Sequence, residues 1–314
     1  MAVTLVEAAK LSQTNLQRGV IETFVQESSI LDRIPFLTIE GNAYGYNEEA
    51  TLPGVAFRSV NEAYTESTGT VNQKSESLVI LGGDADVDKF IVKTRGNLND
   101  QRATQTRMKV KAASYKFQDT FFNGDVTVDA KSFDGLKKRL TGAQVLDAAT
   151  NGMGPVVGAH DFFDLLDALV AAVPGLNGSN GAIYANRLIR SKIQSSARRL
   201  GGVEMIREAL TQKMILTYNG IPLLDPGQNA AGTDILPQTE TQGSSSVASS
   251  VYAVKFGQSE DDRAVTGLTN GGVQAYDLGE LQEKPAYRTR IEFYTGLAVF
   301  GGKAAARLRG VLSA

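Results

Sequence analysis

The sequence contains no cysteine and a single histidine, and these scarcities exclude several kinds of chemistry. Without cysteine the chain can form no disulfide, no thiolate metal site and no cysteine nucleophile. No apolar run approaches the roughly 20 residues that a membrane-spanning helix needs. The N-terminus, MAVTLVEAAKLSQ, has no basic segment followed by an apolar one, which argues against a secretory signal. We therefore expect the protein to gain its strength from burial, strand pairing or assembly, with no membrane as partner.

Excess charge of one sign is also missing, because the formal net charge of the 314-residue chain is only -2. Proteins that hold nucleic acid through phosphate contacts usually have a basic excess, so only local basic patches are possible here. The apolar fraction of 42% is ordinary and allows a substantial core in two domains, or in one domain with large excursions. The 32 glycines favour a chain of turns and strands over a helical bundle.

Candidate reactive groups are few. His160 precedes a helix start beside Asp161 and Asp164, so it could act as a general base that a carboxylate orients. No serine or cysteine nucleophile motif accompanies it, and we interpret it as a surface histidine near a helix cap. GLTNGGVQ (267–274) lacks the spacing of a phosphate-binding loop. Phe117, Phe121 and Phe122 could stack on bases in principle, but are more typical of a core.

The segment GGDADVD places three aspartates at alternate positions, like the start of a calcium loop: Asp84, Asp86 and Asp88. The match then fails, because Lys89 replaces the required glycine and Arg95 the bidentate glutamate. On a strand the three carboxylates would share one face, which predicts a solvated acidic face, with a weak cation site as the minor alternative. We therefore predict no catalytic, cofactor-binding or metal-binding residues, no cofactor, and no enzyme.

The first half of the chain predicts a helix, a long β excursion and a second helix. The first helix has an apolar stripe and ends before Pro35; its stripe is Leu16, Val20, Ile21, Phe24 and Val25. Residues 38–92 are rich in β-branched and aromatic residues, yet 61–77 are polar and can bury little of themselves. LNDQRATQTRMKVKAASYKFQDTFFNG (98–124) predicts one long helix, with N-caps at Asn97 or Asn99 and a buried stripe of Met108, Ala112, Tyr115 and Phe122.

The second half predicts an α/β pattern. HDFFDLLDALVAAVPG (160–175) and NRLIRSKIQSSARRLGG (186–202) are helical, GAIYAN (181–186) is a strand, and Asn219-Gly220 is a hairpin turn between two strands. AAGTDILPQTETQGSSSVASS (230–250) predicts an exposed, mobile loop. Four further strands are expected from VYAVKFG, GVQAYDLG, YRTRIEFYTGLAVFGG and AAARLRGVL.

The β excursion and the long helix have net charges of opposite sign. Residues 40–90 hold nine acidic and three basic residues, whereas residues 93–118 hold seven basic residues and one acidic residue. Complementary docking of the excursion on the helix of a neighbouring copy is one interpretation. Two solvated faces, in which exposed pairs contribute about 0–1 kcal/mol each, are the alternative. Heterologous contacts of the first kind close into rings when repeated.

The order of these parts resembles the major capsid proteins of tailed phages, which share the Hong Kong ninety-seven type fold. FFNGD followed by FDGLKKRL is similar to the segment after the spine helix in one branch of that family. YNGIPLLD and the ending RIEFYTGLAVFGGKAAARLRGV resemble the family's second half. The resemblance implies an α+β fold and a corner in which Gly124 permits a sharp turn and Phe121, Phe122, Phe133 and Leu136 are buried beneath the spine helix.

The resemblance also implies a division of the chain into five parts. These are an N-terminal arm (1–37), an extended β-loop (38–92), a peripheral domain with the spine helix (93–144), an axial domain (145–270) and C-terminal strands that return to the peripheral domain (271–314). The axial loops would gather at the five-fold and six-fold axes.

The function that the resemblance implies is a structural one. The chain would form the pentamers and hexamers of an icosahedral shell around double-stranded DNA, in the virion, after assembly in the host bacterial cytoplasm. A separate scaffolding protein, a portal and a decoration protein would be partners, and DNA would be contacted only non-specifically. Lys74 is the only lysine near the loop tip, and we predict no covalent cross-link through it. An encapsulin-like compartment shell is the first alternative, and a cytoplasmic α/β enzyme acting through His160 is the second.

Overall fold

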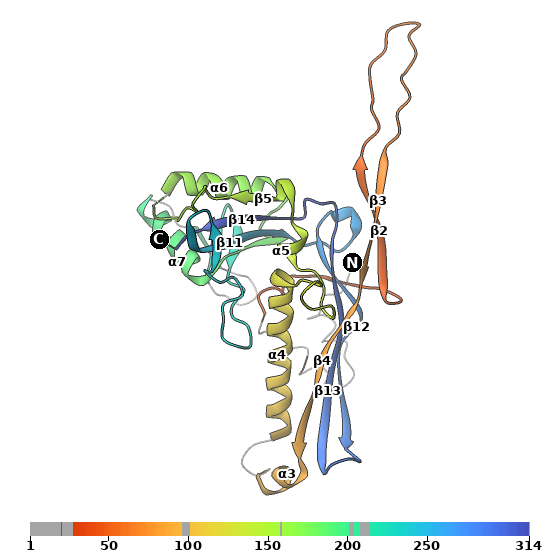
Figure 1. Cartoon of the computed structure of the whole chain (residues 1–314), viewed down its shortest axis with the longest axis vertical. Helices are drawn as coiled ribbons and strands as arrows, with labels where there is room; N and C mark the ends of the chain where they lie inside the picture. The colour runs from red at the N-terminus through yellow and green to blue at the C-terminus, as the bar shows by residue number, and fades with distance from the viewer. Residues whose placement is uncertain are drawn as a thin grey trace.

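The computed structural model describes Val20 and residues 28–95, 101–157, 159–200, 204–207 and 214–313. Figure 1 shows three parts: a long two-stranded arm, a four-stranded sheet with a long helix lying along it, and a larger sheet flanked by helices. The expected N-terminal stripe lies outside the described residues except for Val20, and so do the expected N-caps Asn97 and Asn99. No helix among the described residues has the length and apolar character needed to cross a bilayer.

The arm and the smaller sheet follow each other in the chain. The arm pairs β2 (Ala43–Thr51) with β3 (Thr70–Ser77) in an antiparallel ribbon. The smaller sheet has the order β1-β12-β13-β4, and its strands are β1 (Phe36–Thr38), β4 (Val79–Asp88), β12 (Val265–Glu280) and β13 (Ala286–Val299). Within the segment 38–92, therefore, the arm ends at Ser77, and the following strand β4 belongs to the sheet, where it pairs with β13 from near the C-terminus.

The long helix expected from the sequence is confirmed as α4 (Gln101–Asn123), and α3 (Lys89–Arg95) precedes it. Its expected buried stripe is wrong at Met108, which is 60% exposed. The buried row instead contains Val110, Ser114, Phe117 and Phe121, whose spacing places them on one helical face. The ring of Phe117 packs against Phe36 and Phe293 of the four-stranded sheet, and these contacts determine which face of the helix is buried.

The corner after α4 is buried as expected, with Phe121, Phe122 and Leu136 fully inaccessible and Phe133 nearly so. The role expected of Gly124 is only partly right, because its backbone does not adopt a positive φ. Glycine is required for space: a Cβ at this position would lie 2.3 Å from the Phe133 carbonyl oxygen. Gly135 packs against the same turn, and its N–H donates to the Gly124 carbonyl at 2.9 Å. The sequence alone did not indicate this glycine–glycine contact.

The corner leads through α5 (Leu136–Arg139) and a 3₁₀ turn (Gly142–Gln144) into the larger sheet. This eight-stranded sheet has the order β5-β14-β11-β6-β9-β8-β7, with β10 also paired to β11. Its strands are β5 (Val145–Asp147), β6 (Gly181–Tyr184), β7 (Glu204–Arg207), β8 (Met214–Tyr218), β9 (Ile221–Leu224), β10 (Glu240–Gln242), β11 (Ser245–Lys255) and β14 (Ala305–Val311).

The α/β pattern of the second half is confirmed at its helices and at its hairpin. The helices are α6 (Ala159–Ala171) and α7 (Arg187–Arg199), and Asn186 caps α7 by accepting from the Leu188 N–H. Asn219 and Gly220 both adopt positive φ, 50° and 73°, between the antiparallel strands β8 and β9. A type I′ turn requires this conformation of its two central residues, and asparagine and glycine are the residues that adopt it most readily.

The expectation of an exposed loop over 230–250 holds for residues 230–233, which are exposed and outside any strand, but is wrong from residue 240 onward. Residues 240–242 form β10, residues from Ser245 onward form β11, and Ser249 and Ser250 are buried. β11 is an interior strand that pairs with both β6 and β14. The buried hydroxyls are satisfied, because Ser249 donates to the Leu236 carbonyl and Ser250 donates to the Glu240 carboxylate. A serine-rich composition therefore concealed a core strand.

One core joins the two sheets. Phe122, at the C-terminal end of α4, packs its ring against Tyr184 and Tyr252 of the eight-stranded sheet. Along α4, Phe117 contacts the four-stranded sheet, so a single helix contributes to both. The opposite face of the eight-stranded sheet is covered by a second cluster, which includes Phe162 and Leu166 of α6 and Ile189 of α7. Figure 1 shows α6 on the side of this sheet away from α4.

The corner generates a stability prediction at Gly135. In the variant Gly135→Ala, the new Cβ would lie 2.5 Å from the Thr120 carbonyl oxygen and 2.7 Å from the Gly124 nitrogen, both backbone atoms that cannot move aside alone. We expect the free energy of unfolding in urea to fall by about 3 kcal/mol, the upper end for overpacking. Gly45→Ala is the control, because its nearest neighbouring atom is 4.0 Å away. Equal stability of the two variants would contradict the close-contact role.

Candidate assembly surface

The far end of the arm, which we call the arm tip (52–69), is fully exposed along its whole length. It nevertheless has a set of large apolar side chains with exposed fractions from 69% to 107%: Leu52, Val55, Phe57, Val60 and Tyr64. Figure 1 shows the arm projecting away from both sheets. Contiguous exposed apolar side chains of this kind mark interaction surfaces.

Local contacts give the arm tip a defined shape. The Ser59 N–H donates to the Glu62 carboxylate at 2.9 Å, and Asn61 adopts a positive φ of 67°, which together form a turn. The Arg58 guanidinium lies 5.2 Å from the centroid of the Tyr64 ring and donates to the Glu62 carbonyl at 3.3 Å. The apolar side chains thus lie on a loop beyond the paired strands, and these contacts give its end a defined turn.

Aromatic residues attach the root of the arm to the body. Tyr44 and Tyr46 of β2 pack their rings against Phe300, with centroid distances of 6.3 and 4.9 Å. The Tyr44 hydroxyl donates to Glu260 at 2.5 Å, and this hydrogen bond raises the pKa of the Tyr44 phenol to about 12. Burial raises the pKa of the Tyr46 phenol to about 12, and its hydroxyl donates to the Val299 carbonyl. Both phenols therefore stay neutral near neutral pH.

A shielded ion pair completes the attachment. Arg139 of α5 binds the Glu76 carboxylate of β3 through two parallel hydrogen bonds, one of them 2.7 Å, and the two side chains are only 16% and 17% exposed. Its Nε also donates to the Asp134 carbonyl at 2.6 Å, which ties the arm to the corner. Lys74, expected near the tip, lies in the paired part of the arm and forms an ion pair with Glu48 at 2.5 Å.

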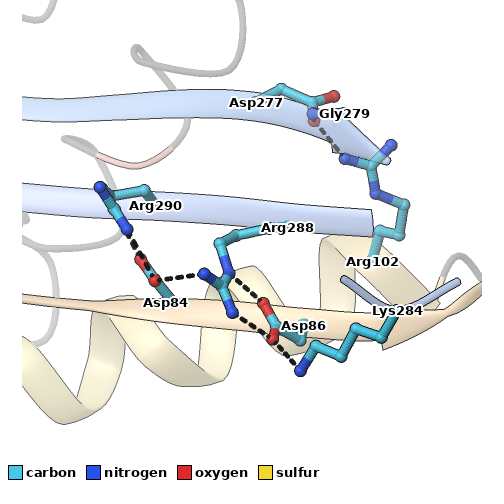
Figure 2. Close-up of polar contacts among 8 residues, drawn as sticks. All are labelled: Asp84, Asp86, Arg102, Asp277, Gly279, Lys284, Arg288 and Arg290. Carbon is cyan, nitrogen blue, oxygen red and sulfur yellow. Dashed lines mark hydrogen bonds and ion pairs between the residues drawn. The ribbon is translucent and has the colours of Figure 1, made fainter. Parts of the chain in front are cut away.

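The acidic strand β4 differs from the expectation. Asp84 and Asp86 do share one face, but that face is not simply solvated, because arginines of β13 occupy the neighbouring positions (Figure 2). Arg290 binds Asp84 through two hydrogen bonds of 2.8 and 2.9 Å, and Arg288 binds Asp86 through two of 2.7 Å. Lys284 also reaches Asp86 at 2.6 Å. We call this set of five residues the ion-pair ladder.

The ladder has consequences for titration and for metal binding. The hydrogen bonds from Arg290 and Arg288 lower the pKa of Asp84 and Asp86, respectively. Asp88 does not join the ladder, and its carboxylate accepts from the Phe90 N–H at the start of α3. Within the described part of the chain, no group of three or more histidine and acidic side chains is arranged to hold a metal ion.

Charge complementarity between the arm and the helix is therefore smaller than the sequence indicated. Four acidic residues of the segment 40–90 are neutralised within their own subunit: Glu48, Glu76, Asp84 and Asp86. On the helix side, Arg102 binds Asp277 at the end of β12 at 2.6 Å (Figure 2). The formal charge difference between the two segments thus overstates the charge available for a neighbouring copy, and the exposed apolar tip is the stronger signal.

The other residues that the sequence suggested as reactive or binding groups lie in different elements and do not form one site. His160 is exposed at the start of α6. GLTNGGVQ lies within β12, where Gly271 and Gly272 have positive φ at a break in the pairing with β13, so it forms an irregularity in a strand. Phe117, Phe121 and Phe122 are buried, as the core interpretation predicted, and cannot stack on bases.

Comparison with known proteins agrees with this geometry. A family model described as "Major capsid protein GP7" matches residues 12–155. Among curated protein sequences, none matches the chain significantly. One similar solved structure is the holo-SrpI encapsulin complex from Synechococcus elongatus PCC 7942, with a TM-score of 0.66 and 16% sequence identity; the match covers 100% of this chain and 97% of that chain. A second is the capsid of a native GTA particle, with a TM-score of 0.65 and 13% identity, covering 91% of this chain and 90% of that chain. A third is a chain of Mycobacterium phage Adephagia, with a TM-score of 0.60 and 10% identity, covering 99% of this chain and 98% of that chain.

The fold and the projecting arm define a class, that of the Hong Kong ninety-seven type fold, which these similar structures share. Within this class, the resemblance to the major capsid proteins of tailed phages is confirmed, through the family match over residues 12–155 and through phage capsids among the similar structures. The expected α+β fold class is confirmed with it.

The root of the arm generates a prediction about coupling. Glu76→Gln and Arg139→Gln should each reduce the free energy of unfolding by about 1–3 kcal/mol, because each leaves a shielded charge without its partner. The double variant should lose less than the sum of the two single losses. Urea denaturation of the four proteins measures the coupling free energy directly. A coupling near zero would show that the pair does not stabilise the arm.

The ion-pair ladder generates a pH prediction. The pKa of each ladder carboxylate is lower in the folded chain than its unfolded value of about 3.9, so the stabilisation is fully present above that pH and is lost as the pH falls through the folded pKa. Since the pairs are partly exposed, each should contribute about 1 kcal/mol or less. We expect Asp84→Asn/Asp86→Asn to be less stable than the parent protein at pH 7 and the difference to shrink below about pH 4.

Unfolding curves at several pH values check this expectation. Glu66→Gln, which removes an exposed carboxylate from the arm tip, serves as a control and should leave the stability unchanged across the same range. A stability difference between the ladder variant and the parent that is as large at pH 2 as at pH 7 would rule out the titration argument.

Proposed function

We propose that this protein is the structural subunit of an icosahedral phage shell, which self-assembles into pentamers and hexamers around double-stranded DNA. The proposal includes the division into an N-terminal arm (1–37), an extended β-loop (38–92), a peripheral domain (93–144), an axial domain (145–270) and C-terminal strands (271–314). Within it, β4 of the second segment contributes to the four-stranded sheet, and β14 of the last segment contributes to the eight-stranded sheet. The protein has no catalytic, cofactor or metal site in this function. It acts in the virion capsid, after assembly in the cytoplasm of a bacterial host.

The observation that carries the proposal is the exposed apolar arm tip. Phe57 is 107% exposed and Val55 is 96% exposed, on an arm whose root is firmly attached. Burying a large apolar side chain is worth about 1.5–3 kcal/mol. A subunit that builds such an arm and leaves these residues in water has its lowest free energy when a second molecule covers them. The arm of one copy therefore docks on the body of the next.

The geometry of that contact is one from which closed rings can be built. The arm tip and the body are different surfaces, so contact between copies is heterologous, with the head of one subunit on the tail of the next. Contacts of this type give rings when the rotation between neighbours closes and open filaments when it does not. Rings of five and six copies are the units from which an icosahedral shell is built. A separate scaffolding protein, a portal and a decoration protein complete the set of proposed partners.

A second candidate function is supported by one comparison. The encapsulin complex from Synechococcus elongatus matches this chain over 100% of its length, so a compartment shell with an enclosed protein would use the same assembly surface. The contents of shells purified from an expressing host bearing the full gene cluster discriminate the two. Nucleic acid inside the shells supports the phage function, and an enclosed protein without nucleic acid supports the compartment.

Removal of the arm tip tests the proposed assembly. Thr51 and Thr70 face each other across the ribbon with their hydroxyl oxygens 2.6 Å apart, so an Asn-Gly turn can replace residues 52–69. We expect the shortened chain to remain soluble, with a free energy of unfolding within about 0.5 kcal/mol of the parent, because the replaced residues contribute nothing to the core. Electron microscopy should show no closed shells.

Substitutions within the arm tip test whether assembly needs its apolar side chains or only the length of the arm. Val55→Ser/Phe57→Ser retains every residue but removes the apolar surface, and it should reduce shell yield at least tenfold, since two burials of about 1.5–3 kcal/mol each are lost at every contact. Thr65→Ala/Glu66→Gln alters polar residues of the same tip and should assemble normally. Normal shells from the shortened chain would contradict the docking model.

A further inference from the structure

The helix α4 has a basic side that the packing of the subunit leaves in solvent. Its exposed residues include Arg107, Lys111 and Lys116, which we call the helix stripe. Residues 101–118 of the helix contain no aspartate or glutamate. Met108 lies beside the stripe and is 60% exposed, so this side is also not covered by the four-stranded sheet. A helical face with bases and no acids creates a local positive potential.

On the opposite side of the same region the charges are largely paired. The outer face of the four-stranded sheet bears the ion-pair ladder, in which Arg290 binds Asp84 while Arg288 and Lys284 bind Asp86. The ladder joins β4 to β13 (Figure 2), and Glu292 accepts from the Tyr294 hydroxyl. One side of the region therefore carries mainly paired charges, and the exposed side of the helix over residues 101–118 carries bases without acids of its own.

The arm of a neighbouring copy is a poor partner for the helix stripe. Of the three acidic residues in its paired part, Glu48, Glu49 and Glu76, two already bind bases of the same subunit, Glu48 to Lys74 and Glu76 to Arg139. The tip contains Glu62 and Glu66 but also Arg58, and Glu62 is hydrogen-bonded within the tip. The arm therefore offers apolar surface more than negative charge, and the stripe fits a partner with a dense negative charge of its own.

We propose that the helix stripe contacts the phosphate backbone of the double-stranded DNA that the shell encloses, an inference that rests on the function proposed above. At a rise of about 1.5 Å per residue, Arg107 and Lys111 are about 6 Å apart along the helix, close to two steps of about 3.4 Å along one DNA strand. Lys116 lines a shallow pocket with Asp119 and Asp129, which weaken its field. The stripe is therefore strongest at Arg107 and Lys111.

The contact is independent of base sequence. Arg107 and Lys111 are exposed on the long helix α4, which lies along the four-stranded sheet. Contacts to phosphates position a protein on DNA without specifying sequence. The stripe would thus line a wall that DNA touches weakly at many points, in agreement with the small net charge of the chain.

The test compares two double variants with equal loss of charge. Arg107→Gln/Lys111→Gln removes the strongest part of the stripe, and Lys192→Gln/Arg198→Gln removes one lysine and one arginine from the exposed side of α7. Binding of the unassembled full chain to two unrelated duplexes of about 20 base pairs is measured between about 50 and 200 mM salt. Shells of the same proteins, isolated from expressing cells, are assayed for retained nucleic acid.

Affinity falls as salt rises, and we expect the slope of log affinity against log salt concentration to be less steep by about 2 for the stripe variant than for the parent chain. The change should be equal for both duplexes, and the control variant should keep the parent's slope. Shells of the stripe variant should form normally and retain less nucleic acid. Unchanged salt slopes together with an unchanged amount of nucleic acid in the shells would overturn the inference and leave the shell function intact. An absence of DNA binding by the parent chain would do the same. A stripe variant that binds DNA like the parent but fails to assemble would assign the stripe to a subunit contact. Failure of the parent chain itself to form shells would instead refute the proposed function.

Discussion

The attachment of the arm at its root is the contact on which the assembly surface depends. A two-stranded ribbon surrounded by water is marginally stable at best, and this one has an apolar tip as well. The root compensates in two ways, through the packing of Tyr44 and Tyr46 on Phe300 and through the shielded pair between Glu76 and Arg139. Because both contacts are near the body, the direction of the whole arm is fixed at one end.

That direction is linked to the long helix through the corner. Arg139, which holds the arm, also donates to the Asp134 carbonyl, and Gly135 packs on the last turn of α4 without room for a Cβ. The corner is buried by the same phenylalanines that join the helix to both sheets. A continuous set of contacts thus runs from the core through the corner to the arm, so the orientation of the apolar tip relative to the body is specified by the interior of the subunit.

Local patterns predicted the elements well and the contacts between them poorly. Asn219-Gly220, the long helix and the four C-terminal strands follow from turn chemistry and periodicity, which need only neighbouring residues. Met108 was misplaced because the buried side of α4 is chosen by Phe36 and Phe293, which are distant in sequence. The pairing of Asp84 with Arg290 spans 206 residues, and no local pattern could reveal it. The serines of β11 were mistaken for a loop because their burial depends on both neighbouring strands.

The arrangement of charge explains how one fold can serve shells with different contents. Within this subunit four acids of the arm and the smaller sheet, Glu48, Glu76, Asp84 and Asp86, are paired with bases of the same chain. Under the proposed function, contact between copies is therefore left mainly to apolar side chains, which need no particular charge inside or outside the shell. The contents can then be selected by a surface that assembly does not use. On this chain the exposed side of α4 is such a surface, and its positive charge suits a polyanion. Function resides in sites placed on a fold. The structural similarity of this chain to both phage capsids and an encapsulin therefore follows from a shared assembly geometry. The difference in shell contents between the two kinds of protein is expected to depend on the few side chains that face the interior.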